Sequence, residues 1–569
     1  MKGGDVSATG DRALAIRGYG EYSITLKNAG TITGNVDLSS DDVRPEFNNL
    51  GGGLFNSGDT VQLDGGTLTN DGTINAAGAG KIDTTTISGK LIQSSTGKIG
   101  VDIDHKAGTA DVIHVESLNR KRESNTLSRL ALENTATLGG TIDPNLLNFN
   151  SASPAKTVTV LTATGGVTVA GLNVVDTALI DYTLLYPDAN TVNLGIDVID
   201  TSAGGALDTL GLTPNQISVV RFLLNGQGAL PADLDKAFTA LFNAPDAATA
   251  GAIAEQLYSN GAGAGAQGAI ETAKALTVAL RSCPTADGDF PQQRETSCLW
   301  AKPEVRSFRQ RKDGDFADVS SNVAGISAGV QTNLAEGWFG GLAASYDDSN
   351  SEINTLTKAD GTWWQVGGVI KWQSGPFKIS SSLTGGNGNL DFERRISLPG
   401  LSLTAQSGTD VSMIDSVTRF SYSFGPSGFY VTPLVDIGLN HVRVDGYTET
   451  GAGALNLAIG GFSETIFSAS PAVEIGSTMT TGELTYRPYL RAGVTFLSED
   501  GFTTATHFAA APGAGTFLTT ARFDDVFADL SAGIQMFGRD GMDLRVNYDG
   551  HFGENSESHG GDVKLTIKY

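Results

Sequence analysis

Five side chains that could bind a metal ion lie close together near residue 110. They are Asp102, Asp104, His105, Asp111 and His114. Carboxylates and imidazoles are ligands that zinc takes in proteins, so this spacing raises the question of a metal site. Alternation along a strand, however, would send these side chains to both faces of neighbouring strands. We therefore predict no metal site here and no cofactor.

A second segment with possible ion chemistry is rich in glycine. Gly51-Gly52-Gly53 is followed by Asn56 and Asp59, a pattern faintly similar to a calcium-binding nonapeptide repeat. The pattern is not repeated, which favours a glycine-rich turn. The sequence also contains no Gly-x-Ser-x-Gly, His-Glu-x-x-His or P-loop motif. We expect that the chain is not an enzyme.

Length and composition indicate a large, acidic protein made of several domains. The chain has 569 residues with 73 glycines, two cysteines and a formal net charge of −24. This length favours two or three domains, and the acidity argues against nucleic acid as a partner. No apolar run reaches the 18 residues of a spanning helix. The start at Met1–Asp5 does not resemble a signal peptide, so secretion would require a signal that was removed or that lies upstream.

Residues 1–200 have the pattern of short strands between turns. Asn28-Ala29-Gly30-Thr31-Ile32 recurs as Asn70-Asp71-Gly72-Thr73-Ile74. We interpret Asn-x-Gly as a corner with positive φ, after which a strand begins with its isoleucine inward. Stacked coils of this kind form a right-handed parallel β-helix, and a β-sandwich with similar turns is the alternative.

Residues 201–297 change to a helical pattern. Thr213-Pro214 with Gln216 predicts an N-cap and a capping box, and further helices should start near 231 and 246. The glycine run at 261–265 predicts a flexible break. After it, Ala266–Arg281 has high helix propensity and would be ~24 Å long as a helix.

From residue 298 the chain shows about twelve runs of roughly ten residues that alternate apolar with polar. They begin near residues 298, 319, 336, 361, 376, 411, 428, 464, 484, 522, 542 and 558. Two of them carry aromatic residues at both ends of the apolar face, namely Trp338 with Tyr346 and Trp364 with Trp372. A soluble sandwich also alternates, but it does not explain these aromatic ends. The pattern favours a transmembrane β-barrel with aromatic girdles.

The run near 542 separates its two faces cleanly. Leu544, Val546 and Tyr548 lie on the face opposite to Arg545 and Asp549. Near 484, Arg487 and Arg491 oppose another apolar set. We expect these four charged residues to face the lumen of the barrel.

The order of several short motifs over residues 105–569 resembles autotransporters, the proteins of type V secretion. In the N-terminal part the matching segments are 108–115 (GTADVIHV), 137–142 (TLGGTI), 158–166 (VTVLTATGG) and 181–184 (DYTL). This order is similar to the pertactin-like junction that ends the passenger, the exported part of the chain. Further segments that match are 212–216 (LTPNQ), the hairpin at 323–346, 447–453 (YTETGAG) and the final Tyr569. Residues 257–260 (LYSN) depart from the family's LSGE.

The resemblance implies a twelve-stranded antiparallel barrel with a helix in its pore. We expect Ala266–Arg281 to be that helix, with Glu271, Lys274 and Arg281 meeting charges such as Arg487, Arg491 and Asp549. An ordinary solvated helix is the alternative. The domains would be a passenger β-helix with its junction over 1–200, a connector over 201–265, a pore helix and loop over 266–297, and a barrel over 298–569. The fold class is thus all-β with a helical linker.

This topology also leads to predictions for the two cysteines and for the C-terminal tyrosine. Cys283 and Cys298 would lie together at the periplasmic mouth, where an oxidising environment favours a disulfide, with two free thiols as the alternative. Tyr569 ends a strand that must pair with the first strand, because an open edge cannot exist in hydrocarbon. The resemblance implies that this terminal aromatic residue is an assembly signal; an interfacial anchor is the alternative.

The predicted function is that of an outer-membrane autotransporter that displays its own passenger, which could be an adhesin. The expected partners are outer-membrane lipid and lipopolysaccharide, the barrel-assembly machinery with periplasmic chaperones, and a ligand on a host or other cell surface. The barrel would lie in the outer membrane and the passenger at the cell surface or outside the cell. A porin-like barrel and a secreted β-helical enzyme acting on polysaccharide are the alternatives.

Overall fold

The computed structural model describes the chain in two compact units. The described residues are all except 1–5, 8–12, 41–42, 77, 118–133, 150–154, 226–230, 282, 285–293, 427, 483 and 539–540. The sequence interpretation of the Met1–Asp5 start therefore concerns residues outside the described part. Unit 1 contains residues 1–212 and 223–253, and unit 2 contains residues 213–222 and 254–569.

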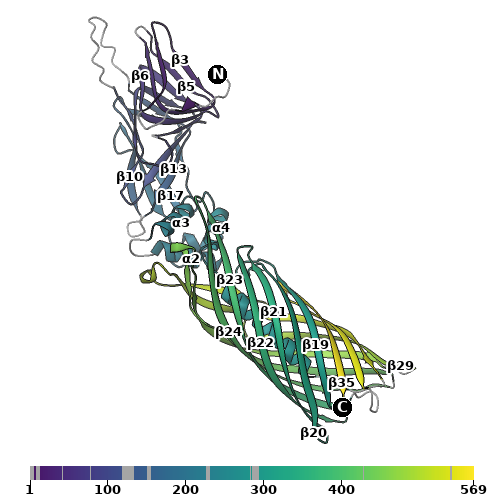
Figure 1. Ribbon diagram of the computed structural model, residues 1–569. Coiled ribbons are helices and arrows are strands. Elements are labelled where there is room, and N and C mark those ends of the chain that lie inside the picture. Colours follow the sequence, from purple (N-terminus) through teal and green to yellow (C-terminus); the bar gives the residue numbers. More distant parts are fainter. Residues whose placement is uncertain are drawn as a thin grey trace. The chain divides into compact units, whose positions relative to one another are not determined.

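Unit 1 is a parallel β-helix, as its sequence predicts (Figure 1). Its central strand β6 (Leu54–Asn70) pairs in parallel with β4 (Thr31–Ser40) on one side and β8 (Thr84–Gln93) on the other. Leu54 thus lies beside Thr31 in the preceding coil and beside Thr73 in the next one. The isoleucines of the repeat point inward, with Ile32 3% and Ile74 1% exposed. Burial of one apolar row per coil therefore builds a continuous core.

A ladder of amides runs through this core. Asn28 donates to Asn49 (2.8 Å), Asn49 to Asn70 (2.8 Å) and Asn70 to Gln93 (3.4 Å). The side chain of Asn49 also donates to the Thr73 carbonyl at 3.0 Å. Each ladder residue thereby satisfies backbone groups at a corner, where regular pairing stops.

The glycine of the repeat has a different role from the one predicted. Gly72 does not have a positive φ. A Cβ on Gly72 would lie 2.3 Å from the carbonyl oxygen of Gly53 and 2.5 Å from that of Leu50. Glycine is therefore needed because the backbones of two coils come close together, and not because of its conformation.

Antiparallel strands and a helix complete unit 1. Strand β18 (Thr191–Val198) pairs antiparallel with both β14 (Lys156–Ala163) and β17 (Ile180–Leu185). Helix α3 (Ala232–Phe242) packs against β13 (Thr141–Asn148). Phe242 stacks on Phe149 with ring centroids 4.0 Å apart, and Asn243 bonds the backbone of Leu146 in both directions. Part of the expected connector therefore covers the end of the β-helix.

The remaining strands of unit 1 have at most seven residues each. They are β1 (Val6–Ser7), β2 (Leu14–Gly20), β3 (Thr25–Asn28), β5 (Glu46–Asn49), β7 (Thr73–Asn75), β9 (Lys98–Asp104), β10 (Thr109–Ala110), β11 (Val112–Val115), β12 (Ala136–Leu138), β15 (Val167–Val169) and β16 (Asn173–Val174).

Three helix starts read from the sequence, at Pro214 and near 231 and 246, are confirmed. Helix α1 (Ala206–Thr209) precedes α2 (Pro214–Asn225), and α4 (Ala247–Glu255) follows α3. Thr213 and Gln216 form the expected capping box, with their two reciprocal bonds at 2.9 and 3.3 Å. The Asp246 carboxylate caps α4 by accepting from the Thr249 backbone N–H at 2.8 Å. Within the described part of the chain, no helix is long and apolar enough to span a membrane.

Unit 2 contains a closed antiparallel barrel. Among the described residues it has twelve long strands, each paired with its neighbours, and the first pairs with the last from Cys298↔Lys568 to Gln310↔Ser556. The strands are β19 (Cys298–Gln310), β20 (Val319–Ala335), β21 (Trp338–Ile353), β22 (Thr357–Ser374), β23 (Phe377–Leu398), β24 (Leu401–Tyr422), β25 (Phe429–Val444), β28 (Phe462–Ser477), β30 (Leu484–Leu497), β33 (Val526–Phe537), β34 (Met542–Phe552) and β35 (Ser556–Lys568). The short β29 (Met479–Thr481) pairs with β30.

Most strand starts agree closely with the sequence pattern, but the strands are longer than ten residues. Strands β23 and β24 have 22 residues each, and β24 begins at Leu401, ten residues before its predicted start. Residues 401–410 contain Gln406-Ser407-Gly408, which resembles a turn in the sequence. They nevertheless pair with β23 along their whole length.

The barrel encloses helix α5 (Gly261–Leu280), which Figure 1 shows inside the ring of strands. The helix begins five residues before Ala266, and the glycine run is helical, so the prediction of a flexible break was wrong. Glycine is needed at these positions because neighbouring residues leave no room for a Cβ atom. A Cβ on Gly263 would lie 2.2 Å from the Cβ of Ala521, and one on Gly265 would lie 2.3 Å from Leu390. The run lets the helix approach the wall.

A small sheet stands beside one mouth of the barrel. It contains β26 (Tyr447–Thr448), β27 (Leu457–Ile459), β31 (Gly501–Phe508) and β32 (Phe517–Arg522), with 3₁₀ turns at Gly453–Leu455 and Pro512–Ala514. The start of α2 docks on this sheet, because Asn215 exchanges two hydrogen bonds of 2.8 Å with Thr520.

Candidate functional site: the lumen of the barrel

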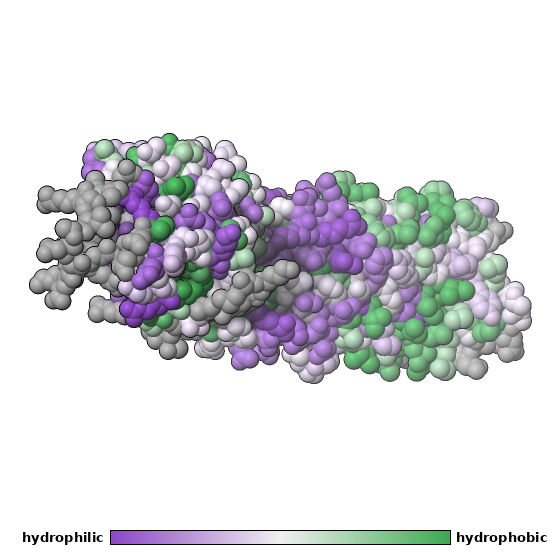
Figure 2. Space-filling model, turned by 90° about the horizontal axis from the view of Figure 1, so that it is seen from above, coloured by the Kyte–Doolittle hydropathy of each residue, from purple (hydrophilic) through white to green (hydrophobic). Residues whose placement is uncertain are grey.

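The outer surface of the barrel is suited to a lipid environment. Figure 2 shows hydrophobic residues spread over the face of it that is in view. Among the exposed apolar side chains of the strands are Leu342 at 67% and Val366 at 66%. Side chains that alternate with them face inward and are polar, as in Ser345, Asp347 and Gln365. An apolar outside with a polar inside is the reverse of a soluble barrel and is typical of outer-membrane barrels.

The four predicted girdle residues form two pairs on this outer surface. Trp338 lies opposite Trp372 and Tyr346 opposite Trp364 on strands β21 and β22. The ring centroids are 6.3 and 4.6 Å apart in the two pairs. Eight residues separate the levels, which at ~3.4 Å per residue is ~27 Å along the strand. This spacing is close to the height of an apolar band in such barrels.

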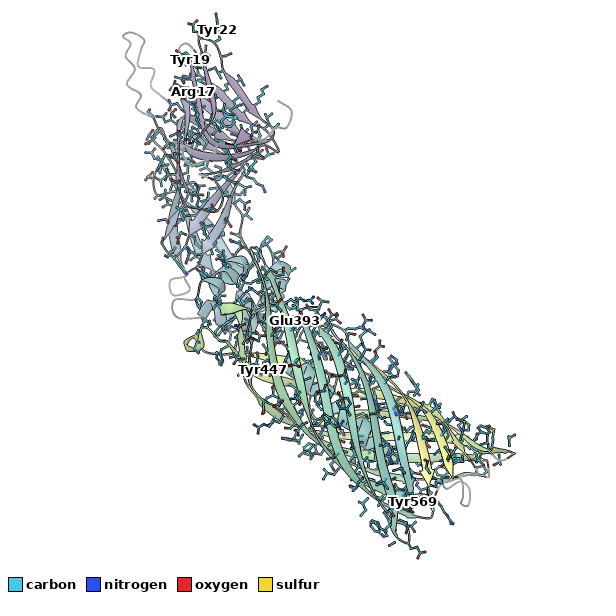
Figure 3. The ribbon with its side chains drawn as sticks, in the orientation of Figure 1. Arg17, Tyr19, Tyr22, Glu393, Tyr447 and Tyr569 are labelled. Carbon is cyan, nitrogen blue, oxygen red and sulfur yellow. A yellow bond between two sulfur atoms is a disulfide. The ribbon has the colours of Figure 1, made fainter. Side chains whose placement is uncertain are left out.

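Different residues lie at the two mouths of the barrel (Figure 3). We call the end that holds Cys298 and Tyr569 the lower mouth, and the end that holds Glu393 and Tyr447 the upper mouth. Helix α5 begins near the upper mouth, where Gly261 approaches Phe392, and ends near Cys283 and Trp300 at the lower one. It therefore passes through the lumen.

Strands β19, β22, β24 and β35 hold the helix through hydrogen bonds. Arg306 donates to the Glu271 carbonyl (2.6 Å), Gln365 to that of Thr272 (3.3 Å) and Lys564 to that of Ala279 (2.8 Å). The Thr277 hydroxyl donates to the Asp415 carboxylate at 2.7 Å. These contacts use long polar side chains of the wall to fill the space beside a helix of small residues.

The charged residues of the helix find partners other than the expected ones. Glu271 pairs with Lys274 on the same helix at 3.2 Å. Arg281 pairs with Asp436 at 2.9 Å, and Asp436 also takes two bonds of 2.7 Å from Arg419. The predicted wall residues do face the lumen: Arg487, Arg491, Arg545 and Asp549 line cavities beside the helix. Arg491 and Asp549 lie 3.6 Å from each other.

A disulfide and a buried carboxylate lie at the lower mouth. Cys283 and Cys298 are joined, with their Cα atoms 6.4 Å apart. Glu295 is 5% exposed and accepts from the Cys283 backbone N–H (3.0 Å), Lys371 (2.9 Å) and Lys378 (2.8 Å). Sequence reasoning missed Glu295, because an acid between the two cysteines gives no sign of partners some 80 residues away.

At the upper mouth a buried ion pair fixes the chain that enters the lumen. Arg394 makes two bonds to the Glu449 carboxylate, at 2.8 and 2.5 Å, and donates to the Gln256 carbonyl at 2.6 Å. Both side chains are at most 3% exposed. In the sequence, Glu449 stands out only as part of the YTETGAG segment, and Arg394 does not stand out at all. A bidentate pair of this kind is strong and directional.

The candidate metal ligands of unit 1 make other contacts, to the backbone or to neighbouring side chains. Both oxygens of Asp111 accept backbone N–H groups, from Asp83 and Asp102, at 2.9 Å each. His105 stacks on Phe149, and His114 contacts Thr162. Burial raises the pKa of Asp111 to about 7, although its two backbone hydrogen bonds act in the opposite direction. Within the described residues, no group of His, Cys, Asp and Glu lies close enough together to hold a metal.

Comparisons with known proteins find relatives of part of this chain. Residues 299–549 match the family model of the autotransporter β-domain. Among solved structures, the chain is similar to the translocator domain of the autotransporter NalP from Neisseria meningitidis, at 13% identity, covering 55% of this chain and 100% of that one, with a TM-score of 0.43.

It is also similar to the β-domain of the Bordetella autotransporter BrkA (16% identity, 48% and 100% covered, TM-score 0.35). A third similar structure is the transport unit of the autotransporter AIDA-I from Escherichia coli (12% identity, 52% and 97% covered, TM-score 0.35). None of the curated protein sequences compared with the chain matches it.

Proposed function

Residues 299–549 of this chain form an autotransporter β-domain, a translocator of the outer membrane, and from this premise we propose that it exports unit 1 of the same chain. Unit 1 is then the passenger, displayed at the cell surface. The role is display and not catalysis. Outer-membrane lipid and lipopolysaccharide surround the apolar band between the aromatic pairs.

The path of the chain through the lumen is the observation that carries this proposal. With twelve strands, the barrel begins at Cys298 and ends at Lys568 at the same mouth. Helix α5 precedes the first strand and runs back through the lumen to Gly261 near the upper mouth. The chain therefore enters the lumen at Gly261 from the mouth opposite to the two ends of the barrel.

The test places one epitope tag on each side of the membrane. A tag after Ala189, in an exposed turn of unit 1, should bind antibody on intact cells. The matched control is a tag between Thr481 and Gly482, in a turn at the lower mouth, which should bind antibody only after the cells are permeabilised. A lower tag that is accessible on intact cells while the upper tag is hidden would contradict the proposed direction.

We also propose that the barrel-assembly machinery recognises Tyr569. The side chain is 71% exposed and anchored by one 3.2 Å bond from its hydroxyl to the Gln331 carbonyl, so a partner can reach the ring. Deletion of Tyr569 or Tyr569→Asp should leave the protein in the periplasm, degraded and without a heat-dependent gel shift. Tyr569→Phe keeps the ring and should insert normally. Normal insertion of the deletion variant would leave only the anchoring role.

For the passenger we propose binding to a ligand on a host or other cell surface. The support is an exposed group at one end of the β-helix, where Arg17, Tyr19 and Tyr22 are labelled in Figure 3. Tyr19 is 72% and Tyr22 is 82% exposed, and large apolar side chains in such positions often mark contact sites. The variant Tyr19→Ala/Tyr22→Ala should reduce adhesion of displaying cells to the target surface at equal display. Unchanged adhesion would rule out this surface as the contact site.

A further inference from the structure

A cavity near the lower mouth is lined by an unusual number of basic side chains. It has a volume of about 120 Å³ and extends beside α5 to Gln373 and Pro376, where β22 ends and β23 begins. Its basic residues come from the helix and from four strands: Arg281, Lys378, Arg419, Arg487, Arg491 and Arg545. Among the described residues that line it, Glu474 is the only carboxylate.

Carboxylates outside the lining neutralise only some of these residues. Asp436 is shared by Arg281 and Arg419, and Glu295 is shared by Lys378 and Lys371. Each of these two acids thus faces two bases. The Glu474 carboxylate accepts a 2.9 Å hydrogen bond from the Tyr430 hydroxyl and also attracts Arg487, Arg491 and Arg545. Asp549 lies 3.6 Å from Arg491, and Asp549 and Asp562 attract Arg545. These three acids face three arginines, while Asp436 and Glu295 face four bases. The region keeps an excess of positive charge in a partly desolvated place, where such an excess favours an anion.

Two of the arginines rest on aromatic rings. The Arg487 guanidinium lies 4.0 Å from the ring centroid of Tyr430, and that of Arg545 lies 5.1 Å from the ring of Tyr489. Arg545 also donates through Nε to the Tyr489 hydroxyl at 2.9 Å and through Nη2 to the side-chain oxygen of Asn547 at 3.5 Å. Within the described part of the chain, neither guanidinium has a carboxylate oxygen within 4.0 Å, and Arg487 makes no hydrogen bond. A ring under the face of a guanidinium leaves the donors at its edge available.

We propose that this cavity binds a tetrahedral oxyanion of the phosphate or sulfate class, held by Arg487 and Arg545. The planar fork of arginine matches such oxyanions through two parallel hydrogen bonds, and it does so better than lysine. The phosphate could be inorganic or belong to a lipid headgroup at the lower mouth. Because Arg281 of the helix lines the same cavity, the bound anion ties the helix to the wall. The inference does not depend on the direction of export.

The experiment uses the full chain in micelles of a neutral detergent. Inorganic phosphate, sulfate and chloride are titrated at constant ionic strength, and binding is followed by ³¹P line broadening and by the thermal unfolding of the barrel. All five tryptophans lie in the barrel, so their fluorescence reports on unit 2 alone. We expect a saturable upward shift of Tm with phosphate and sulfate, and none with chloride.

Three variants test the residues. Arg487→Gln/Arg545→Gln should weaken phosphate binding at least tenfold, and Arg487→Lys/Arg545→Lys, which keeps the charge, should weaken it less. The control Arg443→Gln removes an exposed arginine of β25 (side chain 66% exposed) and should leave binding unchanged. An equal stabilisation of the barrel by all three salts, or equal phosphate binding by the double Gln variant and the wild type, would overturn the proposal. If the Arg487→Gln/Arg545→Gln variant does not insert, the proposal is tested by the wild-type titrations and by the single variant Arg545→Gln.

A second pair of titrations identifies the source of the phosphate. Saturable binding of inorganic phosphate assigns the site to a free ion. Binding of short-chain phosphatidic acid but not of inorganic phosphate or short-chain phosphatidylcholine assigns it to a lipid headgroup. Binding of none of these ligands would show that the arginines are neutralised within the protein, and the proposal would fail.

Discussion

At the scale of single residues, the amide ladder of the β-helix makes Asn49 the most sensitive position. Asn49→Ala removes the donor for Asn70 and the Thr73 carbonyl and the acceptor for Asn28, all inside the core. A buried group left unsatisfied costs ~1–3 kcal/mol, so we expect a loss of about 3 kcal/mol in the stability of unit 1. Urea-dependent proteolysis of the displayed passenger measures it. Asn173→Ala, at an exposed position, should change stability by less than about 0.5 kcal/mol.

Asp111 gives unit 1 a dependence on pH. Its folded pKa of about 7 lies above the ordinary value of 3.8, so the folded state binds the proton more tightly. Stability is therefore highest below pH 4 as far as this group is concerned, and it falls as the pH rises towards 7. The slope should reach at most ~1.4 kcal/mol per pH unit. Asp111→Asn cannot titrate and should lose this slope; a variant with the slope of the wild type would contradict the assignment.

At the scale of elements, replacing two glycines of α5 by alanine should change the stability of the barrel in opposite directions. Gly263→Ala places a Cβ against Ala521, and overpacking of this kind costs ~1–3 kcal/mol. Gly268→Ala meets nothing within 4 Å and should stabilise the helix by up to ~1 kcal/mol. The temperature of the heat-dependent gel shift should thus fall for the first variant and rise for the second. If this temperature fell for both variants, the space around each glycine would not explain the effect of adding a Cβ.

The disulfide at the lower mouth should add to barrel stability. It closes a loop of fifteen residues, for which the chain-entropy model gives ~3 kcal/mol. Cys283→Ser, Cys298→Ser and the reduced wild type should therefore unfold at the same lower temperature. Alkylation without reductant should leave the mass of the wild type unchanged. Two added labels under these conditions would rule out the bond.

The helices and strands also show how much of the fold can be predicted from the sequence. Alternation locates all twelve barrel strands, because the apolar face repeats strictly every two residues, and the capping box at Thr213 locates α2. The start of α5 was missed, since a glycine run in a sequence indicates flexibility unless the wall that crowds it is known. Glu295 and Arg394 were missed for a related reason: their partners, Lys371 and Glu449, are far away along the chain.

At the scale of the whole molecule, the barrel should behave as a plugged pore. The helix backbone is bonded to several strands, and the remaining cavities beside it are small. We expect very low single-channel conductance in planar bilayers, and at least tenfold higher conductance after deletion of residues 261–280. Point variants of the exposed Arg443 should conduct like the wild type. Large conductance of the intact chain would favour the porin-like alternative.

The pairing of β19 with β35 has a consequence for the kinetics of assembly. The two strands that close the barrel are the first and the last of the domain to be synthesised, so their contact has a very long sequence separation. Closing a loop of that length costs about 5 kcal/mol of conformational free energy, and this cost precedes the formation of the hydrogen bonds between the two strands. Until then, two strand edges remain open to aggregation. Closure must therefore follow the completion of the chain, and the waiting polypeptide requires a factor that shields those edges.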